Sequence, residues 1–114
     1  MAQPHTPSGQ LIRLEPLGER LAASTTTALF KAAQLEAVRV VLPRGQALRQ
    51  HHVPGEITLQ CIEGVVDLTA GSAPQQRMHA GDFVHLAAQQ PHALVAVEDA
   101  SLLLTICLVA GPTR

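Results

Sequence analysis

Aromatic residues are almost absent from this sequence. Its 114 residues include two phenylalanines and no tryptophan or tyrosine. Proteins that bind single-stranded nucleic acids usually stack the bases on aromatic side chains, so this mode of recognition is not expected. The net charge is also small, because eight basic and nine acidic residues give a formal value of −1. We therefore expect neither nucleic acid nor an anionic membrane surface as a partner.

Cysteines and long apolar runs are scarce as well. Cys61 and Cys107 lack the CxxC spacing of redox and zinc sites, and each lies in a short apolar run. The spacing indicates two reduced core thiols in a cytoplasmic protein, with a disulfide as an alternative that nothing favours. No apolar run approaches the roughly 20 residues of a membrane-spanning helix. We expect a globular chain without a membrane span.

The sequence contains many apolar residues and many turn formers. Apolar residues make up 46% of the chain, and eight glycines and eight prolines are scattered along it. This composition is typical of short strands joined by turns. The length suits one domain with a modest core. We interpret residues 1–24 as an N-terminal tail with a short strand possible at 11–17, and residues 25–114 as the folded domain.

Alternation of apolar and polar residues predicts the strands. The clearest case is "EITLQCI" at 56–62, where Ile57, Leu59 and Cys61 share one face. About nine short strands without a convincing helix predict an all-β sandwich or barrel. The run at 101–109 is apolar on both faces and therefore needs a second cover. In so small a chain, this indicates another subunit and hence a homodimer.

Two spaced motifs suggest a family. Gly45, "QALRQ", His51 and Gly64 form the first, and "GDFVHLAAQQPH" forms the second, with Gly81, Asp82 and His92. Together they resemble the two motifs of the cupins, over roughly residues 30–109. The resemblance implies a cupin barrel, that is, a jelly roll or double-stranded β-helix.

The resemblance also implies a divalent metal ion held by a His-x-His…Glu…His set. Carried over to this chain, the first and last histidines are His51 and His92. The second histidine falls on Val53 and the glutamate on Ile57, neither of which offers a lone pair. The proline and glycine of the second motif fall on Ala87 and Gln89.

A metal site would need further ligands, because transition metals usually take three or more from the protein. His52 could be re-aimed inward by a bulge or a distorted turn before Pro54-Gly55, and His85 is a second candidate. Such an all-histidine site suits Zn²⁺, Ni²⁺ or Fe²⁺. Regular alternation instead places His52 outward, and also Glu56, one residue from the expected glutamate.

Three functions follow as hypotheses. The first is a small-molecule-binding cupin, with a pocket formed by six residues: His51, Val53, Ile57, Leu59, His92 and Leu94. The second is a metal-dependent cupin enzyme, an oxygenase or isomerase, that recruits His52 or His85. The third is a metal-free isomerase with a histidine base, which needs an orienting carboxylate such as Glu63, Asp67 or Glu98. Whether the chain is an enzyme stays open at this point.

Overall fold

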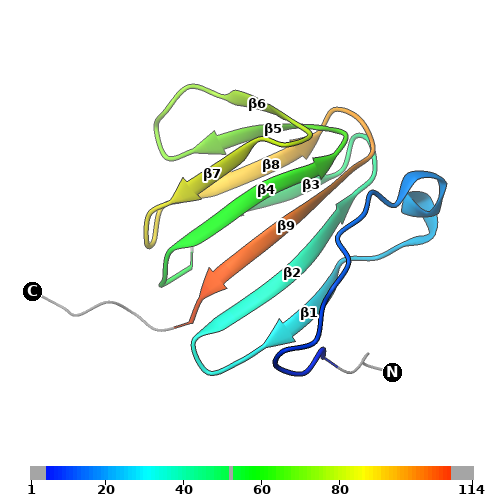
Figure 1. Ribbon diagram of the computed structural model, residues 1–114. Helices are drawn as coiled ribbons and strands as arrows, with labels where there is room; N and C mark the ends of the chain where they lie inside the picture. Colours follow the sequence, from blue (N-terminus) through cyan, green and yellow to red (C-terminus); the bar gives the residue numbers. More distant parts are fainter. Residues whose placement is uncertain (1–4, 52, 109–114) are drawn as a thin grey trace, which may run out of the picture.

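The computed structural model describes residues 5–51 and 53–108, and its regular structure consists of strands apart from one short 3₁₀ helix (Figure 1). All strand pairs of the described residues are antiparallel. One sheet has five strands, in the order β1 (Thr27–Lys31), β2 (Leu35–Leu42), β9 (Ala100–Cys107), β4 (Ile57–Glu63) and β7 (Phe83–Leu86). The other has four, in the order β3 (Ala47–His51), β8 (His92–Ala96), β5 (Val65–Ala70) and β6 (Gln76–His79). The all-β prediction is confirmed.

The core lies where the apolar faces of the two sheets meet. On β4, Ile57, Leu59 and Cys61 are buried, as the alternation of this strand predicts. The facing strands β5 and β8 contribute every second residue in the same way. Buried members of the core include Val40, Leu42, Val66, Leu68, Met78, Leu86, Leu94, Ala96, Ala100 and Leu102. The interior of the fold is thus filled largely with hydrocarbon.

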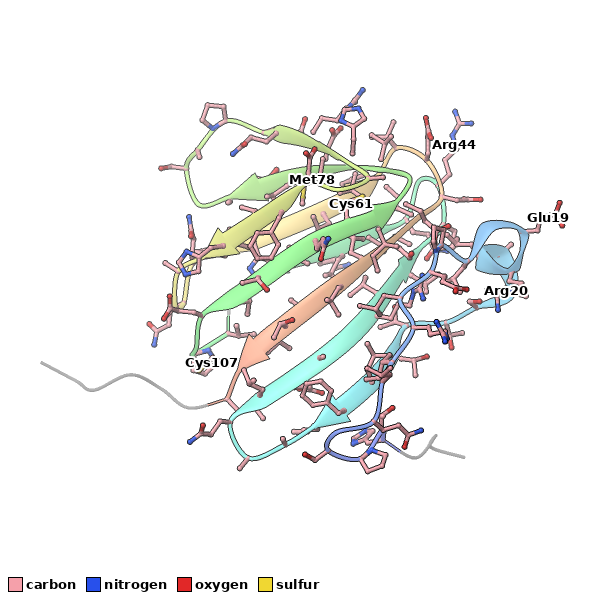
Figure 2. The ribbon with its side chains drawn as sticks, viewed as in Figure 1. Glu19, Arg20, Arg44, Cys61, Met78 and Cys107 are labelled. Carbon is pink, nitrogen blue, oxygen red and sulfur yellow. The ribbon has the colours of Figure 1, made fainter. Side chains whose placement is uncertain are left out.

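The two cysteines lie in different places. Cys61 is fully buried in the core near Met78, whereas Cys107 lies at the far end of β9 (Figure 2). Burial raises the pKa of the Cys61 thiol, and the nearby Asp82 carboxylate acts in the same direction. No disulfide joins the two cysteines. The prediction of a core thiol is confirmed for Cys61, whereas Cys107 is only half-buried and does not belong to the core.

Two local expectations differ from the structure. Residues 11–17 do not form a strand, because side chains of the barrel rather than a strand ladder hold part of this backbone. The short strand β6 was not apparent in the sequence, because only Met78 of its four residues is buried. The segment interpreted as an N-terminal tail also contains a 3₁₀ helix, η1 (Gly18–Ala23).

The segment before β1 runs beside β1 and β2 (Figure 1). Thr6 donates to the Leu29 carbonyl at 3.0 Å, and the Thr26 hydroxyl accepts the Val41 N–H at 2.9 Å. Ala37 and Val41 point away from the core on β2, yet both are buried. Part of the outer face is therefore covered within this chain, which weakens the argument that a second subunit must cover it.

Candidate functional site

His92 is the candidate site residue that the structure places most clearly. It begins β8, which lies between β3 and β5, and only 2% of its surface is exposed. Its backbone lies opposite His51 on β3 and opposite Ala70 on β5. The last residue of the second motif is thus a buried polar group at the edge of a hydrocarbon core.

A backbone carbonyl orients the imidazole of His92. Nδ1 of His92 lies 3.2 Å from the carbonyl oxygen of Gln90. A carbonyl can only accept a hydrogen bond, so Nδ1 must carry the proton in this contact. In the neutral ring, the lone pair is then on Nε2. The side chain can accept a hydrogen bond there, or ligate a cation.

A tight turn precedes His92. The Gln90 N–H donates to the Ala87 carbonyl at 3.2 Å, and Gln89, the third residue of the turn, has a φ of 62°. The Gln89 N–H donates to the Val53 carbonyl at 2.8 Å, which ties this turn to the first motif. The glycine expected from the family pattern falls on Gln89, and the left-handed backbone explains why the pattern has glycine there.

Val53 and Ile57 take the positions of two expected metal ligands. Ile57 is buried and belongs to the core, and Val53 is half-buried and packs against it. Leu59 and Leu94 are buried in the same core. The four apolar residues predicted to line a pocket therefore surround or adjoin the interior. They offer hydrocarbon and no metal ligand.

The first motif contains an irregularity just before its histidines. Leu48 lies opposite Leu94, and His51 lies opposite His92, so β3 has one more residue than β8 between these pairs. This is a β-bulge, a feature that re-aims side chains. The sequence allowed a bulge or a distorted turn before Pro54-Gly55, and the structure has a bulge in β3, between Leu48 and His51. The side chain of His51 and the whole of His52 lie outside what the structure describes.

His85 is on the other side of the sheet from the core. Its neighbours Val84 and Leu86 point inward, and 56% of the His85 side chain is exposed. Nε2 of His85 lies 2.6 Å from Oε1 of Glu56, which is also exposed. The structure therefore does not bring His85 together with His92, because strand alternation separates them. Glu56 points outward, as predicted.

These positions do not fit a metal site built from the described residues. Among the side chains that the structure describes, which do not include those of His51 and His52, no group of three His, Cys, Asp or Glu is arranged to hold an ion. His92 supplies one nitrogen, and the positions expected to supply two further ligands carry Val53 and Ile57.

A second polar cluster, which sequence reasoning missed, lies on the outer face of the five-stranded sheet. The Glu63 carboxylate accepts the N–H groups of Leu17 at 2.8 Å and Gly18 at 3.0 Å, and it also accepts the Ser101 hydroxyl. Arg39 lies 3.6 Å from the same carboxylate and donates to Ser101 at 3.3 Å and to the Glu15 carbonyl. The cluster fastens residues 15–18 to the sheet. We refer to Glu63, Arg39 and Ser101 as the outer cluster.

The environment of Glu63 changes its acidity. Burial raises the pKa of Glu63, but hydrogen bonds from Leu17, Ser101 and Gly18 and the charge of Arg39 together hold it below the usual value. Only 15% of the Glu63 side chain and 11% of that of Arg39 are exposed. The outer cluster is thus a largely desolvated, charged tether. Glu63 serves this tether and does not orient His92.

The other carboxylates considered as partners for a histidine base lie elsewhere. Asp67 forms an ion pair with Arg77 across β5 and β6, at 2.9 Å. Glu98 is exposed in the turn before β9. The described hydrogen bond of the His92 side chain is to the Gln90 carbonyl and not to one of these carboxylates.

Hollows on the described surface include the following two. One of about 420 Å³ lies between residues 5–12 and the end of β1, beside Phe30. Another of about 280 Å³ lies between β6 and β7, over Leu68 and Met78. His92 lines neither of them, so neither is the pocket that the sequence predicted.

Comparison with known proteins places the chain in a family. The model of the cupin domain matches residues 38–109, which include both motifs. No functionally curated protein matches the sequence. In the part of the chain that the structure describes, no helix has the length and hydrophobicity needed to cross a bilayer.

Solved structures share the fold at low sequence identity. A cupin superfamily protein from Desulfitobacterium hafniense is 12% identical, with a TM-score of 0.74 over 93% of this chain and 97% of that chain. A conserved protein of unknown function from Streptococcus pyogenes is 20% identical, with a TM-score of 0.71 over 99% of this chain and 97% of that one.

A third solved structure is also similar. KdgF from a Halomonas species is 20% identical, with a TM-score of 0.66 over 78% of this chain and 80% of that chain. At such identities the likeness concerns the fold, which confirms the predicted double-stranded β-helix. Together with the family match over both motifs, it shows that this chain belongs to the cupin family.

Proposed function

We propose that this cupin binds a small organic molecule at the edge of the barrel interior, beside His92, with His92 and His51 as the polar groups that orient it. Ligand sites of this kind are mostly apolar with a few convergent polar groups. Here Val53, Ile57 and Leu94 would supply apolar contacts. The burial of His92 beside a hydrocarbon core is the observation that carries the proposal.

A buried histidine needs an explanation, because an apolar side chain of similar shape can often take the place of a buried polar one at little cost in stability. His92 begins a strand whose other inward residues, Leu94 and Ala96, are apolar. Its backbone partner on β3 is a second histidine, His51. Two histidines opposite each other at the edge of an apolar interior support a polar contact point for a ligand.

The metal-dependent alternative predicts a different composition of the purified protein. The decisive experiment is native mass spectrometry together with elemental analysis of untagged protein. We expect a bound organic mass, and no stoichiometric Zn, Ni or Fe. The organic mass should be lost in His92→Leu and retained in His85→Leu, the matched control on the outer face. Stoichiometric metal that is lost in His92→Leu would establish the alternative, and protein that carries neither would refute both.

The expected homodimer is also a proposal. Phe83 on β7 is 65% exposed, and it lies in one row with Gln60 and Leu103 on the outer face. We propose that a second copy of the chain packs there, away from the N-terminal segment. Sedimentation equilibrium should give a dimer for the wild type and a monomer for Phe83→Lys. A monomeric wild type would contradict this. We place the protein in the cytoplasm, in keeping with two cysteines that form no disulfide.

A further inference from the structure

We infer that Gln90 is the positioning residue of the site, and that its side chain fixes the protonation form in which His92 meets a ligand. Gln90 stands two residues before His92, at a position of the second motif to which the family pattern assigns no particular residue. The inference rests on the proposed function, because His92 matters only if it contacts a bound molecule.

The side chain of Gln90 adds a second hydrogen bond across the turn. Its backbone N–H donates to the Ala87 carbonyl at 3.2 Å, and its Oε1 accepts the Ala87 N–H, also at 3.2 Å. The amide end lies close to Gly71, where a Cβ would be 3.3 Å from Nε2 of Gln90. Gln90 is half-buried, in contrast to the exposed Gln89 beside it. The side chain therefore fills the space between the turn and the end of β5.

The following residues hold the turn from the other side. The Gly71 N–H donates to the Pro91 carbonyl at 2.8 Å, and proline at 91 restricts Gln90 to an extended backbone. Between these two anchors, the Gln90 carbonyl is aimed at Nδ1 of His92, at 3.2 Å. The position of this carbonyl is thus set by the closed turn and not by His92.

The chemical consequence concerns Nε2 of His92. A fixed carbonyl opposite Nδ1 selects the tautomer with the proton on Nδ1. Whatever faces Nε2 of the neutral ring, in the protein or in a ligand, must then donate a hydrogen bond or be a cation. The ligand class that suits this site is an apolar molecule carrying a hydroxyl or N–H group, since an unprotonated carboxylate would meet a lone pair.

The test is the tautomer of His92, measured by long-range ¹H–¹⁵N correlation at pH 8 on chelator-treated protein. In the wild type, Nδ1 should give a pyrrole-type signal and Nε2 a pyridine-type signal. Gln90→Met keeps the length of the side chain but removes its acceptor and donors. We expect the tautomer ratio to shift toward the Nε2–H form by roughly fivefold, the factor that a typical net hydrogen bond contributes.

Gln89→Met is the matched control, because the exposed Gln89 side chain has no described role in the turn and its N–H bond to Val53 is retained. It should leave the tautomer ratio unchanged. A wild type with the proton on Nε2, or a Gln90→Met variant that keeps the wild-type ratio, would overturn the inference. The tautomer of His92 can be measured whether or not an organic molecule is bound, so this failure is distinct from the failure to find a bound organic mass.

Discussion

The protein contains two largely buried polar sites that differ in how they are built. The imidazole of His92 stands at the edge of the hydrocarbon core and is held by a turn two residues away. The outer cluster joins β2, β4 and β9 to residues 15–18, so its partners are far apart in the sequence. The outer cluster has a clear structural task, because it fastens the N-terminal segment. His92 instead adjoins the apolar residues predicted to line a pocket, which is why we propose a role in ligand binding for it.

The largest effect is expected next to the outer cluster, at Gly64. Its φ is 81°, and an added Cβ would lie 2.0 Å from the Asp99 carbonyl oxygen. The backbone must therefore move, and Gly64→Ala should lower the free energy of unfolding by at least about 3 kcal/mol. Gly45→Ala is the control, because Gly45 has a similar φ of 84° and nothing within 4 Å. It should cost only about 1 kcal/mol, as read from urea denaturation.

This pair of glycines shows what the sequence could predict. Both belong to the first motif, which together with the second motif was sufficient to predict the barrel. The spacing does not reveal that Gly64 approaches the turn at Asp99, since that contact exists only after β4 and β9 have paired. The outer cluster was missed for the same reason. Glu63, Arg39 and Ser101 look like ordinary strand residues until the fold brings them together.

The local backbone geometry of β3 also could not be predicted from the sequence. The bulge in β3 adds one residue to a strand, and a shift of one residue exchanges the two faces. The sequence therefore could not decide how His51 and His52 point. By contrast, the outward position of Glu56 was predicted correctly, because β4 is regular from Ile57 to Cys61.

Glu63→Gln tests the outer cluster directly. The new amide keeps the volume but places an NH₂ group opposite backbone N–H donors, and it removes the charge that faces the largely buried Arg39. We expect a loss of about 2 kcal/mol in the free energy of unfolding. Asp67→Asn, which breaks the ion pair with the exposed Arg77, should have little effect. Equal losses in the two variants would contradict a special role for the outer cluster.

The acid dependence of stability should follow from the same carboxylate. The pKa of Glu63 is lower in the folded protein than its usual value, so the unfolded chain binds the proton more readily. Its stabilising contribution is fully present above the unfolded pKa of about 4.3 and is lost as the pH falls through the folded pKa. The difference in stability between the wild type and Glu63→Gln should therefore be constant at neutral pH and shrink below about pH 4. A difference that grows on acidification would contradict this.

Gln89→Gly probes the turn that precedes His92. A residue with a side chain at a φ of 62° is strained, and glycine removes that strain. We expect the free energy of unfolding to rise by about 0.5–1 kcal/mol, after the added flexibility of the unfolded chain is counted. Ala88→Gly, one residue earlier and not at a positive φ, should instead lower it. If both variants were destabilised equally, the left-handed backbone at Gln89 would not be a strained feature.

Only a small change in stability is expected where the functional loss should be greatest. His92→Leu exchanges a buried imidazole for hydrocarbon that matches Leu94 and Ile57, and it removes the bond to the Gln90 carbonyl. The gain in apolar packing offsets much of this loss, so the free energy of unfolding should change by less than about 1.5 kcal/mol. Binding of the copurified molecule should nevertheless disappear. A residue whose replacement abolishes binding but hardly changes stability is kept for function, whereas Glu63→Gln should show the reverse. If His92→Leu instead unfolded the protein, the imidazole would be part of the scaffold, and the distinction between the two polar sites would be lost.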